Sequence, residues 1–159
     1  MTEFRVSQGV HRLCTTCAPF VCLLGAGAVQ AGAAWDMFEA RCLDPFEHQA
    51  EAVVSGLAAQ PVDQMHDAKL VFTGSDGLIL VLDAAPREGN RSCAVVTQGA
   101  DALDDGYVRW AGAVTAERRY VAEGDVLASA EWIEPQVHVA VTLDASGATY
   151  TVLETDLES

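Results

Sequence analysis

The sequence predicts a single domain of the α+β class, in which helical structure packs on an antiparallel sheet. Two observations in residues 32–159 predict this class: apolar residues first recur at helical spacing, and strand-like runs separated by turn residues then follow. Half of the 159 residues are hydrophobic, which is enough for one core. We expect one helix, kinked or in two segments, against a meander of about five to six strands.

The helix is predicted from about Ala34 to Ala59. Ala34, Phe38 and Cys42 recur every four residues, which is the spacing of one helix face. A second helical start is indicated at residues 44–47, because Asp44 can act as an N-cap and proline is tolerated at the first helical position. The apolar stripe then continues through Phe46, Ala50, Val53, Val54 and Leu57, and Pro61 ends the helix.

Strand-like alternation dominates the rest of the chain. The turn sequence of residues 74–77 predicts a hairpin, and residues 145–147 predict another. A short helix over residues 101–114, with Asp101 as its N-cap, is expected between two groups of strands. The strands are predicted at 69–73, 78–83, 92–97, 126–133, 137–143 and 148–153. This order of elements resembles the small sheets of profilin and PAS type, a topological likeness that implies no function.

Residues 1–31 have the features of an export signal. Arg5, His11 and Arg12 give a basic start, an apolar run covers residues 18–29, and small residues surround the cleavage position at Ala31. The predicted location is therefore the periplasm or the exterior of the cell. The alternative is an uncleaved anchor in the inner membrane, because residues 13–35 carry no charge and are long enough to span a bilayer.

Cleavage after residue 31 would leave two of the five cysteines, Cys42 and Cys93. In an oxidising compartment we expect them to form a disulfide that joins the helix to the third strand. The alternative is a pair of buried free thiols. The other three cysteines lie within the signal, where a C-x-x-C spacing has neither the redox context nor the second pair that zinc requires.

The charge of the chain excludes some partners. Nine basic and 23 acidic residues give a net charge of −14, so the surface repels nucleic acid and anionic lipid. A membrane would be a partner only if the N-terminal segment is retained. We expect no cofactor, because the glycines form no phosphate-binding loop. We also expect no nucleophilic catalysis, because the serines lie in no nucleophile elbow.

Arginines next to aromatic residues form the first candidate site. Such a pairing can bind a carboxylate or a peptide terminus in a partly apolar groove. The alternative interpretation is that the arginines neutralise the nearby Glu117 and Glu123. The candidate groove consists of Tyr107, Arg109, Trp110, Arg118, Arg119 and Tyr120.

Two pairs of residues are weaker candidates for a divalent cation. His48 and Glu51 share a predicted helix face, and His66 and Asp67 share a loop. Neither pair has the spacing of a zinc site, so solvated surface residues are the preferred interpretation and no metal is expected.

The motif Phe38-x-x-x-Cys42-Leu43-x-Pro45, together with Cys93, resembles short uncharacterised exported proteins of alphaproteobacterial type. This resemblance implies an exported domain with one disulfide and no known activity. We therefore expect a binding or accessory domain, not an enzyme, whose partner is a protein or a small molecule. The alternatives are a membrane-tethered accessory subunit, and a hydrolase or metal-dependent enzyme with an unrecognised site.

Overall fold

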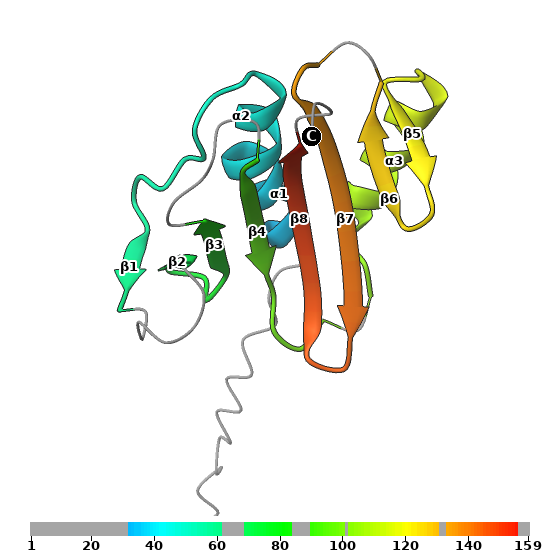
Figure 1. Ribbon diagram of the computed structural model, residues 1–159. Helices are drawn as coiled ribbons and strands as arrows, with labels where there is room; N and C mark the ends of the chain where they lie inside the picture. Colours follow the sequence, from blue (N-terminus) through cyan, green and yellow to red (C-terminus); the bar gives the residue numbers. More distant parts are fainter. Residues whose placement is uncertain (1–31, 62–68, 84–89, 101, 131–132, 156–159) are drawn as a thin grey trace, which may run out of the picture.

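The computed structural model describes residues 32–61, 69–83, 90–100, 102–130 and 133–155, and these form an α+β fold (Figure 1). The predicted signal segment, His66 and Asp67 lie outside the described residues. The helical elements are α1 (Ala33–Phe38), the π-helix η1 (Glu39–Leu43), α2 (Asp44–Glu47) and α3 (Asp105–Ala116). The strands are β1 (Ala58–Gln60), β2 (Lys69–Thr73), β3 (Ile79–Asp83), β4 (Ser92–Val96), β5 (Tyr120–Glu123), β6 (Val126–Ser129), β7 (Gln136–Asp144) and β8 (Gly147–Thr155).

The strands form one eight-stranded antiparallel sheet in the order β1-β2-β3-β4-β8-β7-β6-β5. Two meanders, β1 to β4 and β5 to β8, meet where β4 pairs with β8. The prediction of five to six strands was therefore too low. The two edge strands were missed because β1 has three residues and β5 has four, too few for a clear alternation of apolar and polar residues.

The helices lie together on one face of the sheet (Figure 1). Alternate residues of the central strands face them and are buried, among them Val95, Val139, Tyr150 and Val152. Trp35 and Phe38 of α1 pack into the same core. The opposite face carries no helix of the described residues, and its side chains, such as Val81 and Ala94, are only half-buried.

The predicted continuation of the first helix to Ala59 is wrong. The helix ends after Glu47, and Gln49 adopts a left-handed backbone conformation with a φ of 57°. The chain then runs back, so that Val53 is 40% exposed and Ala58–Gln60 pairs with β2. The apolar residues predicted to continue the helix therefore lie in an irregular segment, because apolar spacing alone does not determine where a helix ends.

Residues 44–47 continue the preceding helix and do not start a new one. Asp44 has helical dihedral angles, and the residue before it makes no side-chain cap. Pro45 has no N–H to donate within the helix. Four residues earlier, in the π-helix, the Arg41 carbonyl accepts a hydrogen bond from the Val53 N–H at 2.9 Å. The segment that follows the helix is thus bonded to it at Arg41.

The helix predicted over residues 101–114 is present as α3, with a different cap. Asp104 is the N-cap and accepts a hydrogen bond from the Gly106 N–H at 2.7 Å. Its other carboxylate oxygen accepts from the Gly32 N–H at 2.8 Å, at the start of α1. One buried carboxylate therefore binds the first turns of two helices, while Asp101 lies outside the described residues.

Candidate functional site

A cleft of about 410 Å³ opens beside the first helix, at the turn between β2 and β3. Three segments that are far apart in the sequence build its walls: the helical residues 33–41, the loop at 56–57 and the turn at 74–76. The lining residues are Ala33, Asp36, Met37, Ala40, Arg41, Gly56, Leu57, Gly74, Ser75 and Asp76. None of the six residues of the predicted arginine–aromatic groove lines this cleft.

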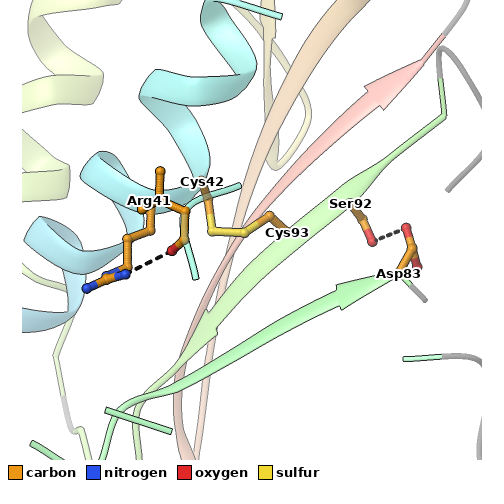
Figure 2. The surroundings of a disulfide bond; sticks show 6 residues. Arg41, Cys42, Asp83, Ser92 and Cys93 are labelled. Carbon is orange, nitrogen blue, oxygen red and sulfur yellow. Dashed lines mark hydrogen bonds between the residues drawn. A yellow bond between two sulfur atoms is a disulfide. The ribbon is translucent and has the colours of Figure 1, made fainter. Parts of the chain in front are cut away.

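The π-helix η1 carries both Arg41 and Cys42. In Figure 2 these neighbouring side chains leave the helix on different sides, Cys42 toward β4 and Arg41 away from it. A π-helix adds one residue to a helical turn, and such bulges are frequent at functional sites. Here it lies between the cleft and the core of the domain.

Arg41 fixes the loop that forms one wall of the cleft. Its Nη1 donates hydrogen bonds to the carbonyl oxygens of Val53 at 2.9 Å and Ser55 at 3.0 Å. Together with the bond from the Val53 N–H to the Arg41 carbonyl, these contacts hold residues 53–55 against the helix. Gly56 and Leu57 follow directly and line the cleft.

The turn between β2 and β3 gives Asp76 a defined position. Its Oδ1 accepts a hydrogen bond from the Leu78 N–H at 3.1 Å, and Gly77 has a φ of 83°. A Cβ atom on Gly74 would lie 2.5 Å from the same Oδ1, so the carboxylate is folded over this glycine. The sequence of residues 74–77 predicted the hairpin turn correctly, but its aspartate also lines the cleft.

The helix supplies a second carboxylate, Asp36, near an acidic neighbour. Partial burial, and then the negative charge of Asp36, raise the pKa of Glu39 above its ordinary value, although a hydrogen bond with Trp35 acts in the opposite direction. Neither Asp36 nor Asp76 forms an ion pair within the described part of the chain. The lining of the cleft therefore carries two carboxylates against the one guanidinium of Arg41.

The cysteine pair lies where the sequence predicted it. Cys42 and Cys93 form a disulfide in the structure, with Cα atoms 5.6 Å apart, and both residues are fully buried (Figure 2). The bridge joins η1 to β4, directly behind the helical wall of the cleft. Next to Cys93, the Ser92 hydroxyl donates to Asp83 Oδ2 at 2.6 Å.

Asp83 also accepts a hydrogen bond from Lys69 on the neighbouring strand. Burial by itself raises the pKa of an aspartate. The hydrogen bonds from Lys69 and Ser92 outweigh this effect and hold the pKa of Asp83 below its ordinary value. This ionised carboxylate ties β2, β3 and β4 together on the face of the sheet away from the helices.

The structure places the residues of the predicted groove in two different settings. Tyr107 and Trp110 pack on Trp35, with ring centroids 5.5 and 5.2 Å away, and Tyr120 packs on Trp110 at 5.1 Å. Arg109 and Arg118 are exposed. The rings are therefore largely engaged with the core, and the binding role of the groove stays a prediction.

Arg119 and Tyr120 contact a carboxylate that no sequence pattern predicts. The Tyr120 hydroxyl donates to Glu47 Oε1 at 2.7 Å, and Arg119 Nη2 lies 3.3 Å from Glu47 Oε2. Burial, followed by the hydrogen bond and the charge of Glu47, raises the pKa of Tyr120 far above its ordinary value. Arg119 thus forms an ion pair with Glu47, and the expected ion pairs with Glu117 and Glu123 are not among those of the described residues.

The candidate metal ligands lie apart from the cleft. His48 is exposed and lies 3.4 Å from Asp44, and Glu51 is exposed and lies 3.3 Å from Arg91. Within the described ranges, no group of three or more histidine, cysteine, aspartate or glutamate side chains could hold a metal ion. His66 and Asp67 lie outside those ranges.

The fold and the cleft together define a small α+β domain with one disulfide and a half-open, mixed polar and apolar site. No protein-family model, curated protein or solved structure matches the chain. The resemblances to profilin and PAS sheets and to exported proteins therefore stay predictions. No helix in the described part of the chain is long and apolar enough to cross a membrane.

Sequence reasoning missed the site because its residues have no common motif. Asp36, Arg41 and Asp76 come from segments that only the folded chain brings together. The one available signal was the Gly74-Ser75-Asp76-Gly77 turn, which we interpreted through turn chemistry alone.

Proposed function

We propose that this chain is an exported binding domain for a small ligand, and that the cleft at Asp36, Arg41 and Asp76 is its binding site. The observation that carries the proposal is the cleft itself, whose lining combines apolar side chains with fixed polar groups. Small-ligand sites in proteins have this composition, and their polar groups are held in place by the surrounding fold. Here Arg41 fixes one wall, and the hydrogen bond to Leu78 fixes Asp76.

The lining favours binding over catalysis. Ser75 is its one hydroxyl, and no histidine lines the cleft within the described residues to act as a base for it. The lining carboxylates come from exposed residues, a setting that does not tune an acid–base pair by burial. A hydrolase is therefore the weaker alternative.

Export is the second part of the proposal. The disulfide between Cys42 and Cys93 supports it, because such bridges persist in oxidising compartments and are rare in the cytosol. Residues 1–31 would act as the signal and be removed. An accessory subunit tethered through residues 13–35 is the alternative.

Mass spectrometry of the protein purified from its native cell envelope tests export. We expect a chain that begins at Gly32 and whose two cysteines react with a thiol reagent only after reduction. A full-length chain in the membrane fraction would favour the tethered subunit. A full-length chain in the cytosol with two free thiols would contradict export.

A thermal-shift screen of small metabolites against the oxidised domain tests the binding site. We expect at least one compound to raise the melting temperature of the natural protein and not that of Ser75→Trp, whose bulk narrows the cleft. Ala113→Trp, on the exposed part of α3, is the matched control and should respond like the natural protein. Equal shifts in all three proteins, or no shift with any compound, would contradict the proposed site.

A further inference from the structure

We propose that the cleft selects a small organic cation, namely an ammonium group attached to an apolar body. This inference rests on the proposed function and adds the chemical class of the ligand. It depends on three observations: the charged residues of the lining, the apolar side chains beside them, and the net charge of the whole chain.

The lining carries two carboxylates and one guanidinium. Arg41 donates from Nη1 to two backbone carbonyls and keeps its positive charge. Asp36 has no ion-pair partner among the described residues. Asp76 uses Oδ1 for the Leu78 N–H, so its Oδ2 is not used in that bond. Carboxylates therefore outnumber the guanidinium two to one, and their oxygens accept hydrogen bonds from a cation.

Part of the lining is apolar. Ala33, Met37, Ala40 and Leu57 contribute aliphatic and thioether surface, and Met37 is 9% exposed. A methylene chain or small ring bound against these residues would be removed from water, which is favourable in proportion to the apolar area covered. The combination of apolar side chains and carboxylates in one lining fits an amine with a hydrocarbon portion.

A bare metal ion fits this lining less well. Calcium and magnesium are bound by six or more oxygen ligands, whereas two carboxylates line the cleft and one of them already accepts a backbone hydrogen bond. An ammonium group needs only two or three acceptors, which Asp36 and Asp76 can supply.

The net charge of the chain also favours the binding of a cation. At −14, the protein attracts cations and repels anions, and the lining of the cleft carries two carboxylates against one guanidinium. Binding of a cation should therefore weaken as salt screens these charges.

Three probes of equal length test the proposal by calorimetry: hexylammonium, hexanol and hexanoate. We expect the natural protein to bind hexylammonium about tenfold or more tightly than hexanol, with hexanoate weakest. Asp36→Asn with Asp76→Asn should remove this preference, so that hexylammonium binds no more tightly than hexanol; asparagine keeps the shape and the acceptor for Leu78. Asp105→Asn with Glu117→Gln, two exposed residues at the ends of α3, is the control for the loss of two charges.

The outcomes separate the two proposals. If Ser75→Trp abolishes binding of all three probes but the natural protein binds hexanol as tightly as hexylammonium, the binding site stands and the cation preference is overturned. If Ser75→Trp binds hexylammonium as well as the natural protein does, the cleft is not the site and both proposals are overturned. If calcium chloride displaces more hexylammonium than sodium chloride does at equal ionic strength, the cleft is a metal site and the proposal of an organic cation is overturned.

Discussion

At the scale of single residues, the best-defined polar feature is the buried ion pair of Arg91 with Glu154. Arg91 donates from Nε to Glu154 Oε2 at 2.5 Å and from Nη2 to Oε1 at 2.9 Å, and the two side chains are 12% and 3% exposed. The guanidinium also lies 4.6 Å from the centre of the Phe46 ring and donates to the Ala50 carbonyl at 3.1 Å. Arg91 therefore joins the end of the first helix to the last strand.

We predict that Arg91→Ala lowers the free energy of unfolding by about 3–5 kcal/mol, because it leaves the Glu154 carboxylate buried without its partner. Urea unfolding followed by circular dichroism measures the loss. Glu51→Ala is the matched control: it removes the exposed partner of the same arginine and should change stability by less than about 0.5 kcal/mol. Similar losses in the two variants would show that burial of Glu154 is not the cause.

Contacts between individual residues could be predicted from the sequence only where the chemistry of the residue type limits the possible partners. Two cysteines left by a cleaved signal have one pairing, and Cys42 and Cys93 are indeed paired. Arg91 and Glu154 are 63 positions apart in a chain with 23 acidic residues, so no local pattern selects this partner. For the same reason, no local pattern predicts the contact of Glu47 with Tyr120.

At the scale of elements, the contact between α1 and α3 depends on a glycine. A Cβ atom on Gly106 would lie 2.4 Å from Cδ1 of Trp35, whereas one on Gly112, in the same helix, would meet nothing within 4 Å. Trp35 is buried and contacts the rings of Phe38, Tyr107, Trp110 and Tyr150. Gly106 therefore permits the close approach of the two helices.

We predict opposite effects of the same substitution at these two positions. Gly106→Ala should destabilise the domain by about 1–3 kcal/mol, because the Trp35 ring must move within a packed core. Gly112→Ala should stabilise it by up to about 1 kcal/mol, because alanine favours the helix at a position with open space. Thermal unfolding followed by tryptophan fluorescence measures both; a gain of stability in Gly106→Ala would contradict this account of the packing.

The element order was predictable where the periodicity was sustained. The strands β2, β7 and β8 and the helix α3 lie close to their predicted ranges. The first helix was predicted too long because its end depends on a tertiary contact, the bond from the Val53 N–H to the Arg41 carbonyl. The cleft could not be predicted for a related reason, since its wall is the segment returning from that helix end.

At the scale of the whole molecule, the disulfide closes a loop across the fold. Cys42 and Cys93 are 51 positions apart and connect the helical layer to the sheet. We predict that replacing both by alanine lowers the free energy of unfolding by about 4 kcal/mol, from the loop entropy restored to the unfolded chain. Denaturant unfolding of the oxidised protein and of the double variant measures this; reduction of the natural protein should give a similar loss. Equal stability of the oxidised and reduced protein would contradict a stabilising bridge.

The three tyrosines give the whole domain a sensitivity to alkali. Burial raises the pKa of Tyr107, Tyr120 and Tyr150 above the ordinary value of 10.0, with Glu47 adding to the effect at Tyr120. Because the folded pKa is the higher one, this stabilisation is complete below pH 10 and is lost as the pH rises above that value, where only the unfolded chain ionises readily. We therefore predict that tyrosinate absorbance appears together with the loss of near-ultraviolet circular dichroism. After correction for its changed stability at neutral pH, Tyr120→Phe should show this joint transition at a higher pH than the natural protein. Tyrosinate absorbance that appears well before unfolding would contradict the prediction.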